Sequence, residues 1–202
     1  MYTFHLTEEI ARWAFEVVCK QSNDWYVAFT NPTAGPWKTI KCTDQRTGEI
    51  GEVYRFELEE TRPDILLVND TMKTILIVEA KDSIEKLTAG DQVNKTVEVV
   101  SQLTDILKKK SDCKFWGQRS TYEIITALLW GADRTIQRTE YDELFLQHRQ
   151  SISEFPNVSD DIIIGVETRR NGETLTCRIC GSARSGNSQR IEAIARSFGL
   201  HT

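Results

Sequence analysis

The sequence predicts a single α/β domain, residues 1–202, with a mixed central β-sheet flanked by helices. Two kinds of periodicity indicate this class: short apolar or alternating runs are typical of strands, and apolar residues at helical spacing are typical of helices. A length of 202 residues is sufficient for one domain with a proper core. The 40% hydrophobic and 27% charged content is typical of a soluble globular protein.

The first predicted elements are a helix and a short strand. Thr7 precedes two glutamates, which is typical of a helix start, and we expect the helix to end within residues 20–23. Residues 25–29 are predicted to form a strand, and the composition of residues 31–48 is typical of a loop. The apolar face of the helix is predicted to contain Ile10, Trp13 or Ala14, and Val17.

The central feature of the chain is a predicted β-hairpin. Apolar runs at residues 65–68 and 75–78 are separated by a polar run with turn-forming residues. If the turn is centred in the middle of that run, Asp64 lies directly opposite Glu79, with both side chains on one face of the sheet. Residues 52–59 alternate charged and apolar residues, and we expect them to complete a three-stranded meander with the hairpin.

Three charged side chains should therefore converge at the end of two apolar strands. Lys81 lies two residues beyond Glu79 and points to the same side of the sheet as Glu79 and Asp64. Two opposed carboxylates repel each other, and a divalent cation such as Mg²⁺ would offset the repulsion. The lysine ammonium would stabilise negative charge on a phosphate or lower the pKa of an attacking water. The residue chemistry predicts metal-assisted hydrolysis of a phosphodiester.

The pattern Pro63-Asp64, fourteen residues, and then Glu79-Ala80-Lys81 resembles the signature of the PD-(D/E)XK nuclease superfamily, which includes most type II restriction endonucleases. The resemblance implies a restriction-endonuclease-like core of order αβββαβ over about residues 6–131, with residues 132–202 as a C-terminal extension of the same domain. It also implies that Asp64, Glu79 and the backbone carbonyl of Ala80 bind the metal. Lys81 would orient or activate the attacking water.

The resembling nucleases often carry a glutamate on their first helix that reaches the metal through water. Glu9 is the candidate by position, and Glu16 is a rival. An ordinary solvated helix glutamate remains the alternative for either residue.

The expected function is that of a Mg²⁺-dependent endodeoxyribonuclease, a type II restriction endonuclease or its catalytic subunit. Mn²⁺ should substitute for Mg²⁺, whereas Ca²⁺ should support binding only. The alternatives are a repair or structure-specific nuclease of the same fold and, in another class, a non-catalytic partner subunit of a DNA-processing complex. Expected partners are double-stranded DNA and either a second copy of the chain or a larger subunit. The sequence has neither a bilayer-spanning apolar run nor a signal-peptide pattern, so we expect a cytoplasmic location and no membrane partner.

A net charge of −5 argues against an extended, non-specific nucleic-acid binder, because such proteins are usually basic. It does not exclude a nuclease, since a local basic face can coexist with a negative total. Candidate DNA contacts are therefore basic or polar residues outside the hairpin, although each is also explained as an ordinary surface residue. They are Trp37, Lys38, Lys41, Arg46, Gln92, Arg169, Arg170, Arg184 and Arg190.

The second half of the chain continues the alternation of helices and strands. His148 shares a helix face with apolar residues and is predicted to pack rather than to catalyse. The predicted elements are a long helix from within residues 83–91 to about 108–110, a buried strand at 121–131, a helix opening at Thr139, a hairpin of residues 162–166 and 174–180, and a last helix that ends at Gly199.

The cysteines do not indicate a disulfide framework, because there are five of them and they are scattered. Cys177 and Cys180 have the spacing of a metal knuckle, but no second Cys or His pair stands nearby to complete a zinc site. The strand pattern around them predicts that their side chains point to opposite faces of a sheet.

Overall fold

The computed structural model describes residues 8–22, 24–30, 40–43, 50–54, 63–88, 90–108, 117–132, 136–155, 158–171, 173–184 and 187–200. Helices and strands alternate along these residues. In chain order they are α1 (Glu8–Gln21), β1 (Tyr26–Thr30), β2 (Ile40–Thr43), β3 (Ile50–Tyr54), β4 (Ile65–Asn69), β5 (Thr74–Lys81), α2 (Ile84–Leu87), α3 (Gly90–Lys108), β6 (Glu123–Ala132), α5 (Arg138–Ile152), β7 (Val158–Asn171), β8 (Thr174–Ala183) and α6 (Ser188–Ser197).

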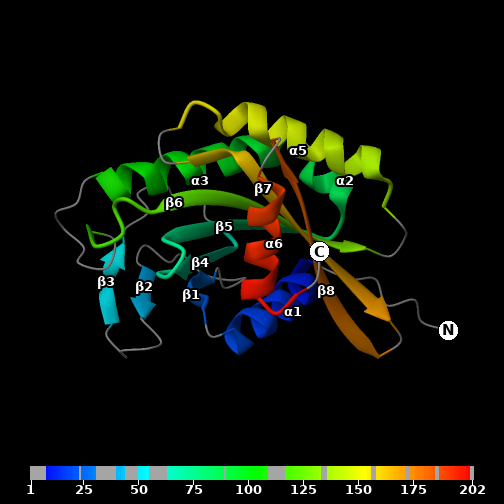
Figure 1. The fold of residues 1–202 in the computed structure, drawn as a ribbon, viewed down its shortest axis with the longest axis horizontal. Helices are drawn as coiled ribbons and strands as arrows, with labels where there is room; N and C mark the ends of the chain where they lie inside the picture. The colour runs from blue at the N-terminus through cyan, green and yellow to red at the C-terminus, as the bar shows by residue number, and fades with distance from the viewer. Residues whose placement is uncertain are drawn as a thin grey trace.

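A six-stranded mixed sheet forms the centre of the molecule, with strand order β1-β4-β5-β6-β7-β8 (Figure 1). Strands β5, β6 and β7 are parallel, and the other neighbours in this sheet are antiparallel. Strands β2 and β3 form a separate two-stranded sheet. The structure therefore confirms the predicted α/β class, a mixed central sheet flanked by helices.

Helices cover both faces of the central sheet (Figure 1). On one face, which we call the α3/α5 face, helices α2, α3 and α5 pack over a core that includes Ile77 and Trp130. On the other, the α1/α6 face, helices α1 and α6 pack over a core that includes Leu76 and Leu129. Because side chains alternate along a strand, successive residues of each strand lie on opposite faces of the sheet.

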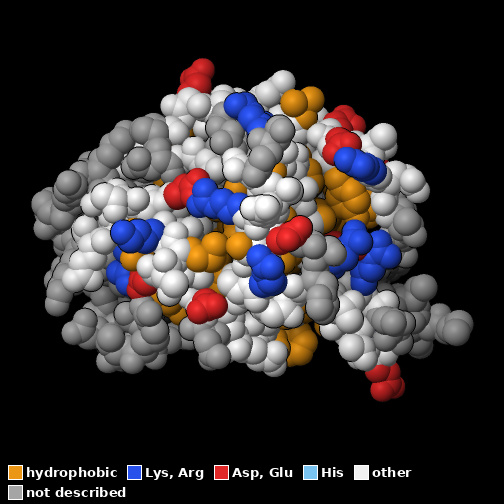
Figure 2. All heavy atoms as spheres, viewed as in Figure 1, with side chains coloured by type: hydrophobic (Ala, Val, Ile, Leu, Met, Phe, Trp, Pro, Cys, Tyr) orange, Lys and Arg blue, Asp and Glu red, His pale blue; other side chains and the backbone are white. Residues whose placement is uncertain are grey.

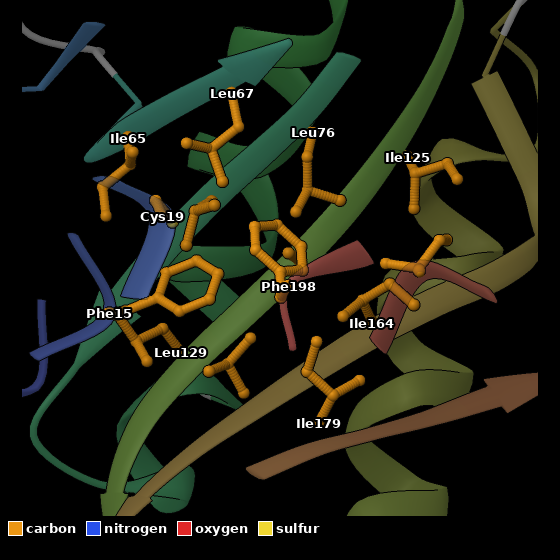
Figure 3. Packing of buried hydrophobic residues seen from close by; sticks show 14 of the residues in the cluster. Phe15, Cys19, Ile65, Leu67, Leu76, Ile125, Leu129, Ile164, Ile179 and Phe198 are labelled. Carbon is orange, nitrogen blue, oxygen red and sulfur yellow. The ribbon is translucent and has the colours of Figure 1, made fainter. Parts of the chain in front are cut away.

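Three aromatic rings pack together within the mainly aliphatic core of the α1/α6 face. Figure 3 shows Phe15 of α1 beside Leu129, and Phe198, which follows α6, near the centre of the same cluster. The Phe198 ring is stacked on that of Trp25 at a centroid distance of 4.8 Å and tilted against that of Phe15 at 5.4 Å. These contacts fix both helices on the sheet.

Helix α1 has nearly the predicted bounds, and of the two alternatives on its predicted apolar face Ala14 is right and Trp13 is wrong. Ala11, Ala14, Phe15 and Cys19 are buried, whereas Trp13 is 61% exposed. The helix carries two stripes of apolar residues at helical spacing. Besides Phe15, the buried stripe contains the small side chains Ala11, Ala14 and Cys19, which allow the helix backbone to approach the sheet closely.

The predicted three-stranded meander is also wrong in its first strand. Of the predicted strand at 52–59, residues 52–54 belong to β3, which pairs with β2, and residues 55–59 lie outside the described residues. The outer neighbour of β4 is β1, with Tyr26 opposite Val68. Strand β4 is buried on both faces, so its outer neighbour has to supply apolar side chains. The segment around β1 supplies the buried Trp25 and Tyr26.

The predicted elements of the second half are confirmed. Helix α5 starts with a capping box in which the side chains of Gln137 and Glu140 each accept a backbone N–H of the other residue. The β7–β8 hairpin is present, and α6 is followed by Gly199, whose φ of +69° favours glycine. Cys177 and Cys180 are free thiols that pack on opposite faces of the sheet, as predicted.

No helix in the described part of the chain is long and apolar enough to cross a bilayer.

His148 is completely buried between α5 and α2, which confirms its predicted packing role. Its Nε2 lies 3.2 Å from the carbonyl oxygen of Leu87, and burial lowers its pKa. The Nδ1 atom is buried with no hydrogen-bond partner among the described residues. A proton added at Nδ1 would therefore be left unpaired in the core.

We expect the free energy of unfolding to fall as pH drops below about 6.5, the ordinary histidine pKa. In that range the unfolded chain binds a proton that folded His148 excludes, so acid favours unfolding. The variant His148→Gln keeps an N–H donor for Leu87 and cannot titrate. Urea unfolding at several pH values should show the wild type losing up to about 1.4 kcal/mol per pH unit relative to the variant. Equal pH dependence in the two proteins would contradict this role.

Candidate active site

The β4–β5 hairpin has the predicted register. Ile65 pairs with Val78, and the backbone N–H of Asp64 donates to the carbonyl oxygen of Val78 at 3.1 Å. Asp64 therefore lies opposite Glu79, as the sequence predicted. Both strands are almost entirely buried, so the carboxylates extend an apolar pair of strands at its open end.

The turn end of the same hairpin is held by a separate ion pair. Arg119 donates to both carboxylate oxygens of Asp70, at 2.9 and 3.0 Å, and the Tyr122 hydroxyl donates to the same carboxylate at 2.9 Å. Such a bidentate arginine–carboxylate pair restricts the geometry of both partners. This ion pair thus anchors the turn end of the hairpin.

Asp64 is buried, with 7% of its surface exposed. One of its oxygens, Oδ2, accepts the backbone N–H of Ala80 at 2.7 Å, which orients the carboxylate. Burial raises the pKa of Asp64, and the Ala80 N–H together with the cations Lys81, Arg12 and Lys95 opposes this rise. Desolvation outweighs these stabilising contacts, so the ionised carboxylate is held at a cost in free energy.

The Lys81 ammonium contacts both the Glu79 carboxylate and the carbonyl group of Ala80. Its Nζ lies 3.1 Å from Oε1 of Glu79 and donates to the carbonyl oxygen of Ala80 at 2.6 Å. Glu79 itself is buried, with 6% of its surface exposed. The ammonium, two carboxylates and one backbone carbonyl consequently converge at the C-terminal end of β5.

This set of oxygen atoms fits a hard divalent cation. Asp64, Glu79 and the Ala80 carbonyl offer the two carboxylates and the carbonyl that Mg²⁺ accepts, and such sites commonly leave other positions to water and phosphate. The Lys81 ammonium already touches Glu79 and the Ala80 carbonyl, so that region attracts positive charge. Among the described residues, no group of three or more His, Cys, Asp or Glu side chains is placed to hold a metal.

Arg12 of helix α1 acts electrostatically on this site. Glu9 is exposed, and Glu16 is half-buried with its Oε1 3.9 Å from Nε of Arg12. Burial raises the pKa of Glu16, against the opposing effect of Lys20 and Arg12. Arg12 also lies close enough to Asp64 to lower its pKa.

Sequence reasoning missed Arg12 on α1 and Lys95 on α3, which both act electrostatically on Asp64. These helices cover opposite faces of the sheet, so the two cations approach the carboxylate from different sides. The i, i+4 spacing of Arg12 and Glu16 is visible in the sequence, but it indicates only a helix-surface pair. Nothing in the local sequence links either cation to the hairpin.

The predicted DNA contacts are scattered in space. Gln92 lies in the first turn of α3, and its buried Oε1 has no hydrogen-bond partner within the described ranges, so an acceptor is available there. Arg184 follows the end of β8, and Arg190 pairs with Glu123 at the start of β6, so both lie at the end of the sheet opposite Lys81. Trp37, Lys38, Arg46 and the side chain of Lys41 lie outside the described residues.

Arg169 and Arg170 occupy consecutive positions on β7 and so point to opposite faces of the sheet. Arg169 lies on the α3/α5 face and donates a hydrogen bond to Glu167. The sequence had not indicated a role for Glu167. Arg170 is exposed on the other side. The two arginines therefore cannot act as one pair.

Comparison of the chain with protein-family models gives no match, and neither does comparison with curated proteins or with solved structures.

Proposed function

We propose that this chain is a Mg²⁺-dependent endodeoxyribonuclease, a type II restriction endonuclease or the catalytic subunit of one. The observation that carries the proposal is the convergence of Asp64, Glu79, Lys81 and the Ala80 carbonyl at one end of a buried hairpin. Burying two carboxylates side by side is unfavourable unless a ligand or counter-ion stabilises them. Binding of a metal ion for a metal-dependent reaction would account for this unfavourable arrangement.

A restriction-endonuclease-like core is part of the same proposal. The order α1, β1, β4, β5, α3, β6 follows the αβββαβ pattern, with β1 as its first strand. The parallel pairing of β6 with β5 then places the start of α3 and the end of β5 at the same end of the sheet. In this arrangement β2 and β3 are an insertion, and residues 132–202 extend the sheet by two strands.

The residues of the site have distinct roles in hydrolysis. Asp64, Glu79 and the Ala80 carbonyl would hold Mg²⁺, which when bound polarises a phosphoryl oxygen and lowers the pKa of water. The Ala80 N–H fixes the Asp64 carboxylate before any ligand binds. The Lys81 ammonium orients the attacking water or stabilises the negative charge that develops on the phosphate. In-line attack on phosphorus breaks the bond to the 3′ oxygen and leaves 5′-phosphate and 3′-hydroxyl ends.

The proposed ligand is double-stranded DNA. One such site cuts one strand at a time, so cutting a duplex requires a homodimer or a larger partner subunit. Mn²⁺ is expected to replace Mg²⁺ in cleavage. Ca²⁺ is expected to support DNA binding without turnover.

Two alternatives differ in a simple assay with plasmid DNA and Mg²⁺. A restriction endonuclease gives discrete bands, whereas a repair or structure-specific nuclease gives smearing or cuts at branched substrates. A non-catalytic partner subunit gives no cleavage. The intact set of Asp64, Glu79 and Lys81 disfavours the last alternative, because a chain freed from catalysis has no physical reason to keep adjacent buried carboxylates.

Arg12 and Lys95 should assist the proposed reaction by attracting the phosphates on either side of the attacked one. We expect Arg12→Gln and Lys95→Gln each to reduce kcat/KM by about tenfold, the effect of losing one charge-assisted contact. Steady-state cleavage of a labelled duplex measures this. The control is Lys20→Gln, an exposed position at the far end of α1. If Lys20→Gln reduces kcat/KM as much as Arg12→Gln does, the effect comes from the net charge of the protein, and a local role of Arg12 is contradicted.

A further inference from the structure

A row of side chains leads from Lys81 across the sheet. Lys81 pairs with Trp130 on β6, Trp130 with Glu167 on β7, and Glu167 with Arg178 on β8. Directly paired residues point to the same face, so all four lie on the α3/α5 face. Gly165 makes room for this row, because a Cβ at that position would lie 2.7 Å from the Trp130 ring.

Glu167 is an acid in the sheet that the proposed hydrolysis does not use. It is completely buried, yet its pKa is lowered, because hydrogen bonds from Arg169 and Tyr141 outweigh desolvation. Arg169 donates through Nε to Oε1, and the Tyr141 hydroxyl donates to Oε2 at 2.5 Å. Arg178 lies 4.0 Å from Oε1 and donates to the Tyr141 hydroxyl at 3.5 Å. Glu167 is thus the centre of a hydrogen-bonded network.

The network contains more positive than negative charge. Two guanidinium groups face one carboxylate, and their side chains remain 40% exposed for Arg169 and 53% exposed for Arg178. Burial and Glu167 raise the pKa of Tyr141 to about 12, so its hydroxyl stays protonated and continues to donate. Each guanidinium carries five N–H donors, more than these contacts use. The result is two partly exposed arginines held by a buried anchor.

The position of this network fits the path of a DNA strand. Strands are about 4.8 Å apart, so the Glu167 backbone lies about 10 Å from that of Lys81, which corresponds to the axial rise of about three base pairs of B-DNA. In Figure 2 Lys and Arg side chains are spread over the visible face, and some of them lie on the right, where α5 begins and the β7–β8 hairpin extends in Figure 1. The N-terminal end of α5 adds a favourable dipole for an anion.

We propose that Glu167 and Tyr141 hold Arg169 and Arg178 in place as a phosphate-binding arm, which grips the DNA backbone a few nucleotides from the phosphate at Lys81. Glu167 and Tyr141 are positioning residues in this account, and the arginines make the contact. The inference rests on the proposed function for the identity of the ligand. Because phosphates carry no sequence information, the arm should act on every DNA sequence alike.

The alternative is that the arginines only neutralise a buried carboxylate, and Glu167→Gln separates the two explanations. This change makes the protein more positive, so neutralisation alone predicts DNA binding that is unchanged or tighter. Loss of an anchor predicts weaker binding despite the added positive charge. The matched variants are Arg178→Gln, which removes a contact, and Tyr141→Phe, which removes a donor without changing charge.

The experiment measures anisotropy of a short labelled duplex of arbitrary sequence, in Ca²⁺, from about 50 to 200 mM salt. We expect Arg178→Gln to weaken binding about tenfold and to make the slope of log affinity against log salt less negative by about 0.9 per lost contact. Glu167→Gln and Tyr141→Phe should weaken binding several-fold. The control Arg196→Gln changes an exposed arginine on α6, on the other face, and should affect binding less than Arg178→Gln does.

The inference is overturned if folded Glu167→Gln binds DNA as tightly as the wild type, or if Arg178→Gln leaves affinity and salt slope unchanged. Thermal melting establishes that each variant is folded. If Glu167→Gln does not fold, Arg178→Gln and Tyr141→Phe decide by the same criteria. If the wild type cuts and binds DNA and the variants bind DNA as tightly as it does, only the phosphate-binding arm is refuted. If the wild type neither cuts nor binds DNA, the proposed function is refuted.

Discussion

Lys81→Ala should reduce DNA cleavage by about 10²–10³-fold in kcat, the loss typical of removing one preorganised donor for transition-state charge. In the proposed mechanism the ammonium stabilises charge that forms as phosphorus is attacked, so kcat should fall far more than DNA affinity. The fold should survive, because Lys81 is the last residue of β5 and lies at the open end of the hairpin. Single-turnover cleavage with saturating Mg²⁺ measures the effect, and binding in Ca²⁺ should change little.

The matched control for Lys81→Ala is Lys86→Ala. Lys86 pairs with Asp82 on the surface, and 61% of its side chain is exposed. This variant should cut DNA at nearly the wild-type rate. Near-normal cleavage by Lys81→Ala would mean that the interpretation of Glu79-Ala80-Lys81 as a catalytic motif is wrong.

Asp64→Asn should abolish most of the stabilisation that a divalent cation gives to the wild type. A cation at a hundredfold excess over its Kd adds about 2.7 kcal/mol to the free energy of unfolding. In a domain of this size that corresponds to a rise in Tm of about 5–10 °C. Melting curves of both proteins over a range of Mg²⁺ or Ca²⁺ concentrations test this.

Without a cation, Asp64→Asn should be at least as stable as the wild type at neutral pH. The raised pKa of Asp64 means that the folded protein prefers the neutral carboxyl, so ionisation above the ordinary pKa of about 3.9 costs stability. Asparagine is neutral and still offers an oxygen to the Ala80 N–H. The control Asp142→Asn removes a charge from an exposed residue on α5 and should keep the metal response. An equal metal response in Asp64→Asn would contradict the site.

The hairpin could be predicted from the sequence because its determinants are local. Two apolar runs and a short polar turn fix the register of β4 and β5, and the register alone brings Asp64 opposite Glu79. The same local logic gave His148 its packing role and placed Cys177 and Cys180 on opposite faces. Periodicity is sufficient wherever neighbours in space are neighbours in sequence.

The features that the sequence did not predict depend on contacts between distant segments. Strand β1 pairs with β4 across a gap of more than thirty residues, and no local pattern selects it over residues 52–59. Arg12 and Lys95 reach Asp64 only because two helices close on the hairpin from different faces. In the sequence Glu167 is only one polar residue in an alternating strand pattern. Its role becomes visible only when β6 and α5 are packed beside it.

The most direct test of the proposed catalytic site is the sequencing of ends produced from duplex DNA by the purified chain with Mg²⁺, alongside Glu79→Gln and a reaction containing a chelator. We predict cuts with 5′-phosphate and 3′-hydroxyl ends that are absent from the chelator and Glu79→Gln reactions. Folded wild-type protein that leaves every duplex intact in both Mg²⁺ and Mn²⁺, or cleavage that persists unchanged in Glu79→Gln, would contradict it.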